Sequence, residues 1–80
     1  MEKIKLIDAT INKVYFVSCV SGQLPEAIRN RLAELGVVRN NKIVLLHKSK
    51  VSAGGIVWLL STKLCMDERI LAGIEVISYE

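Results

Sequence analysis

One helical segment with clear start and stop signals constrains the fold of this chain most. Pro25 suits the first turn of a helix, where its missing N–H costs nothing, and Gly36 suits the left-handed position past the last turn. Apolar residues between these signals recur at helical spacing and form one stripe: Leu24, Ile28, Leu32 and Leu35. The sequence therefore predicts a helix that packs on a neighbouring element through its leucines.

Four other segments have the composition of short strands, because they are rich in β-branched and aromatic residues. The predicted strands are residues 14–19, 42–48, 55–63 and 74–79. Turn chemistry separates them at Asn40-Asn41 and in the predicted hairpin loop 52–55. Asp67-Glu68 can cap a short helical turn through Ala72. Together these elements predict a mainly β fold with one or two short helices, arranged as a small, strongly curved β-barrel.

The chain length allows one domain, residues 1–80, because half of this length could not bury a core of its own. The composition, 51% apolar and 24% charged, is typical of a globular chain. The longest apolar run, Ile56–Leu60, is far shorter than the roughly 18–20 residues that a membrane-spanning helix needs. The first residues lack the apolar core of a secretory signal. We therefore expect a cytoplasmic protein.

Net charge and cysteine content limit which classes of binding partner and which cellular compartment we expect. The net charge of +3 favours approach to a phosphate, an anionic lipid surface or an acidic partner. The basic residues are scattered, with Lys48-Ser49-Lys50 the densest stretch, and the four aromatic residues offer little stacking surface, so nucleic acid binding is disfavoured. Cys19 and Cys65 have apolar neighbours and form no C-x-x-C pair, so we expect two reduced, buried thiols.

The sequence carries no motif for catalysis. The phosphate-binding loop G-x-x-x-x-G-K-[ST] is absent, which excludes nucleotide hydrolysis by that route. The one histidine, His47, lies beside leucines in a predicted strand, where a surface or rim position is expected rather than a catalytic base. Trp58 is expected to anchor a core or an interface. The sequence therefore predicts a binding module and not an enzyme.

Candidate ligands for a transition metal such as Fe²⁺ or Zn²⁺ are few. The weak candidates share borderline or soft donor atoms: His47, Cys65, Asp67 and Glu68. Their spacing does not match that of a recognised metal motif, and Asp67 also suits a helix cap. Core packing and capping therefore remain the alternatives to a metal site.

The order of elements and two motifs resemble a known family. Residues 28–37, Ile-Arg-Asn-Arg-Leu-Ala-Glu-Leu-Gly-Val, are similar to the R-x-R-L-x-x-L-G-h helix end of ferrous iron transport protein A, the FeoA family. Residues 70–76, Ile-Leu-Ala-Gly-Ile-Glu-Val, resemble the short helix and closing I-x-V strand of that family. The resemblance covers nearly all of the chain from about Leu6. Arg39-Asn40-Asn41 replaces the usual Pro-Gly turn, and Met66-Asp67 replaces a common L-R pair.

The resemblance implies an SH3-like barrel that acts as a cytoplasmic accessory or regulatory protein of bacterial ferrous iron uptake. The partner it implies is FeoB, the membrane ferrous iron transporter with a GTP-binding domain. An alternative is a transition-metal-binding regulatory module, like the SH3-like C-terminal domain of iron-dependent repressors. The first of these two functions, that of an accessory protein, requires no cofactor. A homodimer is as consistent with the apolar strand faces as a different partner is.

Two groups of residues are the candidates for contact with a partner. The predicted helix presents Arg29, Arg31 and Glu34, and the predicted hairpin strands present His47 and Trp58. Activation, assembly and restraint of the transporter are all consistent with such contacts.

Overall fold

The computed structural model describes residues 2–51 and 53–79. The elements are, in chain order, β1 (Glu2–Lys5), the 3-10 helix η1 (Leu6–Asp8), β2 (Val14–Val20), α1 (Glu26–Leu35), β3 (Lys42–Lys48), β4 (Gly55–Leu59), β5 (Thr62–Met66), α2 (Glu68–Ala72) and β6 (Ile74–Ser78). The predicted class, mainly β with two short helices, is confirmed.

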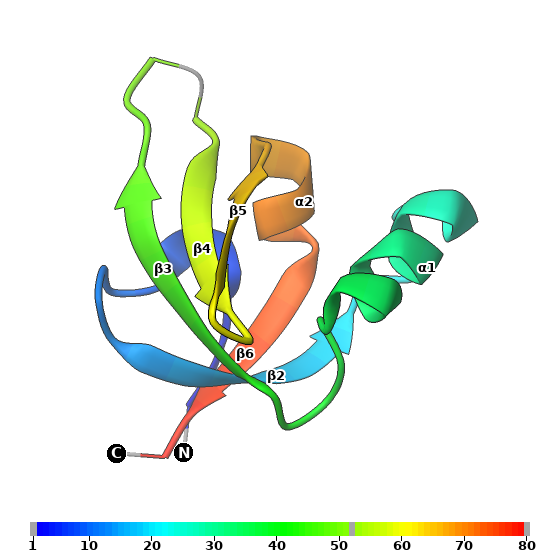
Figure 1. Ribbon diagram of the computed structural model, residues 1–80, viewed down its shortest axis with the longest axis horizontal. Helices are drawn as coiled ribbons and strands as arrows, with labels where there is room; N and C mark the ends of the chain where they lie inside the picture. Colours follow the sequence, from blue (N-terminus) through cyan, green and yellow to red (C-terminus); the bar gives the residue numbers. More distant parts are fainter. Residues whose placement is uncertain (1, 52, 80) are drawn as a thin grey trace.

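The strands form one antiparallel sheet in the order β1-β6-β2-β3-β4-β5. The sheet curves strongly, the β3–β4 hairpin extends beyond its other strands, and α1 lies to one side (Figure 1). Within the described residues β1 and β5 are the two edges and do not pair with each other. The predicted barrel is therefore a curved, open sheet of the small SH3-like kind.

The predicted strand 55–63 is two strands, β4 and β5, joined by a two-residue turn. Leu60 and Ser61 have φ angles of 50° and 65°, and the residues on either side of them, Leu59 and Thr62, pair with each other. Positive φ at both central residues is the geometry of tight hairpins, in which glycine and asparagine are the usual residues. The prediction of one strand was wrong because neither residue type marks this turn.

The helix signals in the sequence are confirmed at both helices, except that Pro25 lies at the N-cap just before α1 rather than in its first turn. Gly36 ends α1 with a φ of 107°, and the Asp67 carboxylate at the start of α2 accepts the backbone N–H of Ile70 at 2.9 Å. In the described residues neither helix combines the length and the apolar character needed to cross a membrane. Of the predicted hairpin loop 52–55, Ser52 lies outside the described residues.

The apolar core fills the concave side of the sheet, which η1 and α2 help to cover. Its fully buried side chains come from most of the elements: Leu6, Val17, Ile43, Leu45, Val57, Leu59, Leu71, Ile74 and Val76. Neither β1 nor η1 was predicted from the sequence. These elements matter to the core because η1 supplies Leu6 and β1 pairs with β6.

Both cysteines are free and exposed, which corrects the expectation of buried thiols. Strict alternation along β2 would place Cys19 inside with Tyr15 and Val17, but the register against β6 shifts between Val17 and Cys19. This bulge turns the Cys19 side chain outward. Cys65 lies on the outer face of β5, directly opposite Ile56.

Candidate functional site

The five predicted docking residues lie on two different surfaces of the molecule. Arg29, Arg31 and Glu34 belong to α1, whereas His47 and Trp58 lie on the outer face of β3 and β4. His47 is exposed, as expected, and Trp58 is half-buried on this outer face rather than in the core.

A groove of about 250 Å³ lies between α1 and the edge strand β5. Only part of the predicted apolar stripe is covered: Leu32 in α1 and Leu24 just before it are buried, but Ile28 and Leu35 are half-buried. The groove is lined by this uncovered stripe and by side chains of β5 and α2: Ala27, Ile28, Arg31, Leu32, Leu35, Leu64, Cys65, Met66 and Ile70. It is therefore an apolar surface with Arg31 as the one charged residue of its lining.

The charged residues of α1 have different environments. Arg31 Nη1 lies 3.8 Å from Glu34 Oε1, and the two side chains are 71% and 70% exposed. An exposed pair of this kind adds little stability. Arg29 is half-buried, and its Nε donates to the Leu24 carbonyl at 3.0 Å, which ties the helix to the preceding turn. Arg31 and Glu34 are thus available to a partner, whereas Arg29 has a structural contact.

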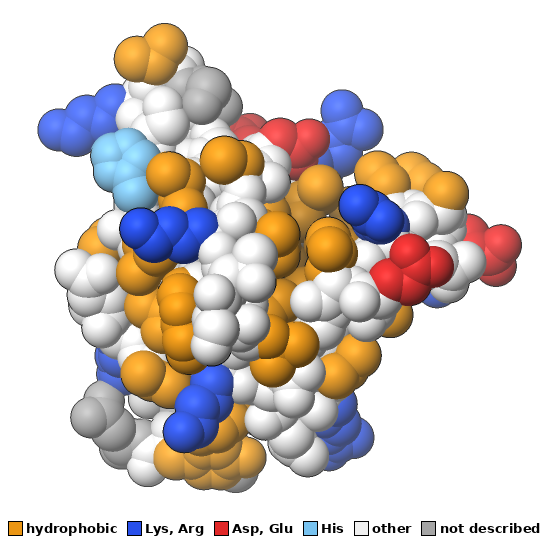
Figure 2. All heavy atoms as spheres, in the orientation of Figure 1, with side chains coloured by type: hydrophobic (Ala, Val, Ile, Leu, Met, Phe, Trp, Pro, Cys, Tyr) orange, Lys and Arg blue, Asp and Glu red, His pale blue; other side chains and the backbone are white. Residues whose placement is uncertain are grey.

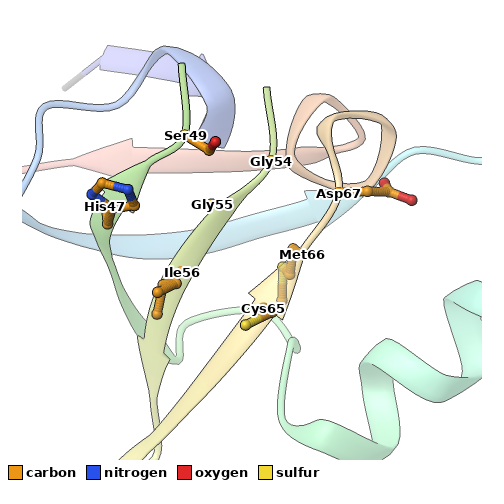
Figure 3. Close-up of a pocket in the computed structure, with 8 residues that line it drawn as sticks. All are labelled: His47, Ser49, Gly54, Gly55, Ile56, Cys65, Met66 and Asp67. Carbon is orange, nitrogen blue, oxygen red and sulfur yellow. The ribbon is translucent and has the colours of Figure 1, made fainter. Parts of the chain in front are cut away.

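The candidate metal ligands lie near one another but are not brought into contact. His47, Ile56 and Cys65 form a row across β3, β4 and β5, at the border of a hollow of about 410 Å³ (Figure 3). Ile56 separates the imidazole from the thiol by two strand spacings of roughly 4.8 Å each. The Asp67 side chain borders the same hollow but points away from both (Figure 3).

A tetrahedral metal centre needs three or four donor atoms around one point. Across residues 2–51 and 53–79 no three His, Cys, Asp or Glu side chains are placed to hold a metal ion together. Glu68 is exposed in the first turn of α2 and does not line the hollow. As placed in a single chain, the four candidates therefore do not fit one metal site.

A polar cluster that was not predicted from the sequence joins β1, β2 and β6. The Cys19 thiol donates to Glu75 Oε1 at 2.8 Å, and Lys3 Nζ lies 3.4 Å from the same oxygen. The hydrogen bond to Glu75, followed by desolvation, raises the pKa of Cys19. The same hydrogen bond, followed by that of Lys3, lowers the pKa of Glu75. No local pattern could have indicated this cluster, because its residues are far apart in the sequence and meet through strand pairing.

We expect the Cys19 thiol to be alkylated several-fold faster in the Glu75→Gln variant than in the wild-type chain at pH 8. The raised pKa keeps the thiol protonated, and the thiolate is the reactive form. The variant removes the negative charge that favours the protonated thiol. Iodoacetamide labelling followed by mass spectrometry from pH 7 to pH 9 measures the rate, with Cys65 as the internal control. Equal Cys19 rates in the two proteins would contradict the assigned hydrogen bond.

Comparison with known proteins gives matches among solved structures. No protein-family model and no curated protein sequence matches the chain. The FeoA protein of Chlorobium tepidum matches with a TM-score of 0.85 and 26% identity, over 96% of this chain and 71% of that chain. A second match is Stenotrophomonas maltophilia FeoA complexed with zinc, which is described as a prokaryotic SH3 domain protein. The TM-score is 0.76 and the identity 22%, over 89% of this chain and 86% of that chain.

A manganese-dependent transcriptional repressor also matches, with a TM-score of 0.83 and 16% identity over 95% of this chain and 41% of that chain. The likeness to the repressor and to the zinc complex is one of fold. These matches confirm the SH3-like fold, and together with the Chlorobium tepidum protein they confirm the resemblance to the FeoA family.

Proposed function

We propose that this chain is a cytoplasmic, non-enzymatic accessory protein of ferrous iron uptake that docks on the transporter FeoB as a single domain, residues 1–80. The observation that carries the proposal is the likeness to the Chlorobium tepidum FeoA protein, which extends over 96% of this chain at 26% identity. The Stenotrophomonas maltophilia FeoA is described as a possible ferrous iron transport activating factor, which supports a transporter as the partner.

The groove between α1 and β5 is the docking surface that we assign to this function. Its half-buried residues Ile28 and Leu35 leave apolar area in water, and each Å² that a partner removes contributes about 25 cal/mol. Arg31 adds a planar, permanently charged group that suits a carboxylate of the partner. The groove therefore fits an apolar segment that carries an acidic residue close to Arg31.

Arg31→Glu is expected to weaken docking about tenfold and to leave the domain folded. Reversing a charge at an interface opposes like charges across it, which costs affinity. Within α1 the change places a second glutamate three residues from Glu34, at a cost of only about 0.2–0.5 kcal/mol. Titration of the purified cytoplasmic GTP-binding domain of the transporter measures the affinity, and complementation of ferrous uptake measures the function.

Lys50→Glu is the matched control, because it makes the same change of charge at an exposed residue outside the groove. We expect Lys50→Glu to dock and to complement as the wild type does. Wild-type affinity and uptake in the Arg31→Glu variant would show that this groove is not the docking surface.

A transition-metal-binding regulatory module is the second candidate function. The zinc complex of Stenotrophomonas maltophilia FeoA and the match to a manganese-dependent repressor favour it. In this chain His47 and Cys65 would supply two donor atoms from the outer face of the sheet. Because Ile56 lies between them, a second copy or a partner would have to supply the remaining ligands.

A further inference from the structure

We infer that the outer face of β2, β3 and β4 is a second docking surface, which takes an apolar segment of a partner protein bordered by acidic side chains. The inference rests on the proposed function, because the partner is the transporter. It adds a second point of contact and the chemistry of the partner at that point.

Three of the four aromatic residues of the chain lie on the outer side of the sheet instead of in its core. Phe16 and Trp58 are half-buried and Tyr79 is 61% exposed, while Tyr15 alone is buried. The rings of Phe16 and Tyr79 meet edge to face with centroids 5.1 Å apart. Large rings left in water at neighbouring positions are typical of a surface that another molecule covers.

Two aliphatic residues extend this surface, since Val14 is 49% exposed and Leu60 is 59% exposed. We call these residues the aromatic face: Val14, Phe16, Trp58, Leu60 and Tyr79. Phe16 lines two hollows, one of about 430 Å³ shared with Trp58 and Leu60 and one of about 550 Å³ shared with Val14 and Tyr79. The aromatic face is therefore hollowed on both sides of Phe16 and can receive apolar side chains there.

Charge is strongly segregated along the sequence, which the modest net charge of +3 conceals. Residues 9–25 and 35–66 contain no Asp or Glu, and they contain six basic residues: Lys13, Arg39, Lys42, Lys48, Lys50 and Lys63. These two segments include β2, β3, β4 and β5. In Figure 2 acidic side chains lie over α1 and near α2, whereas the face of β3 and β4 carries basic side chains among hydrophobic ones.

Two of these lysines place their charge beside the aromatic face. Lys42 is directly opposite Phe16 in the β2–β3 ladder, and Lys63 is directly opposite Trp58 in the β4–β5 ladder. Directly paired residues share one face of a sheet, with their Cβ atoms roughly 4.5–5.5 Å apart. Both lysines are exposed. The aromatic face therefore has a cationic border, which is complementary to Asp and Glu side chains of a partner.

The aliphatic residues of the aromatic face favour a protein over a polynucleotide. Bases stack on aromatic rings, but Val14 and Leu60 offer no ring and are stabilised by burial against apolar side chains. An apolar centre with a polar border is the usual anatomy of a protein interface, where Trp and Tyr carry much of the binding energy. We therefore assign this face to a protein segment.

Two variants test the charge and the apolar contact separately. Lys42→Glu/Lys63→Glu reverses the charge of the border, and Leu60→Asn removes the aliphatic group while asparagine tolerates the φ of 50° at that position. Thermal unfolding shows whether each variant stays folded. Lys50→Glu is the control, because it reverses a charge in the same acid-free segment but borders neither hollow of the aromatic face.

The probe is the purified cytoplasmic GTP-binding domain of the transporter, titrated into the isotopically labelled chain. We expect the resonances of Phe16 and Trp58 to shift, the double lysine variant to lose at least tenfold in affinity, and Leu60→Asn to lose several-fold. Lys50→Glu should stay within twofold of the wild type. The loss caused by the double variant should shrink at high salt, because the contact is electrostatic.

The possible failures separate the inference from the proposed function. If the wild type binds the probe but the double lysine variant binds equally well, or if the shifts are confined to the groove between α1 and β5, the inference is overturned and the proposed function stands. If the wild type does not bind the probe, the proposed function is overturned and the inference with it. If an oligo(dT) strand shifts the resonances of the aromatic face and the probe does not, the face is a nucleic acid site and the inference is overturned.

Discussion

Replacing Leu45 with alanine is expected to lower the free energy of unfolding by about 2–5 kcal/mol. Leu45 is fully buried in β3 and pairs with the equally buried Val57 of β4. The expected loss is a large share of the roughly 5–15 kcal/mol that stabilises a domain of ordinary size. Thermal unfolding followed by circular dichroism should show a midpoint lowered by about 10 °C or more.

Val51→Ala is the control for this prediction, because Val51 is 99% exposed. Its truncation should change the free energy of unfolding by no more than about 0.5 kcal/mol. Similar midpoints for the Leu45 and Val51 variants would contradict the packing of β3 described above.

Gly36→Ala is expected to lower the free energy of unfolding by about 1–3 kcal/mol. Gly36 has a φ of 107°, which side chains of L-residues rarely adopt, and an added Cβ would meet the Leu60 side chain of the β4–β5 turn. The strain falls where α1 joins the sheet, so the groove beside α1 should also be disturbed. Urea unfolding measures the stability, and the affinity for the transporter domain measures the state of the groove.

Gly22→Ala is the matched control, because Gly22 has no positive φ and an added Cβ there meets nothing within 4 Å. Alanine at such a position reduces the conformational freedom of the unfolded chain. The free energy of unfolding should therefore stay the same or rise by about 0.4–1 kcal/mol. Equal losses for the two glycine variants would show that the backbone of Gly36 is not specially constrained.

Local signals in the sequence located the helices and three of the strands, β2, β3 and β6, to within a residue or two. Pro25, Gly36 and Asp67 act within a few residues of themselves, so α1 and the cap of α2 could be predicted without any knowledge of the fold. The strand predicted at residues 42–48 matches β3 because it is a continuous apolar run between a turn and a loop. Boundaries that depend only on neighbouring residues were therefore predictable.

Features that depend on strand pairing could not be predicted in this way. The turn at Leu60 and Ser61 is imposed by the pairing of β4 with β5, since its residues do not favour positive φ. The bulge after Val17 exposes Cys19 against the alternation of β2. Neither feature leaves a mark in the local composition.

The candidate site shows the same division. The sequence indicated Arg31 and Trp58 as contact residues, but it could not show that they lie on separate surfaces. The absence of acidic residues between Leu35 and Met66 is visible in the sequence alone. Its meaning depends on the order of the strands, which gathers Lys42 and Lys63 around the aromatic face.

The position of β6 affects the chain while it is being made. Of the six strands of the sheet, β6 leaves the ribosome after the other five, but it lies between β1 and β2 in the finished sheet. Synthesis proceeds at about 5–20 residues per second. For several seconds, therefore, β1 and β2 are already synthesised while the edges that later pair with β6 are still unpaired. Unpaired edges can join the strands of other nascent chains. Protection of these edges from aggregation on the polysome therefore depends on a strand that is translated after the other five.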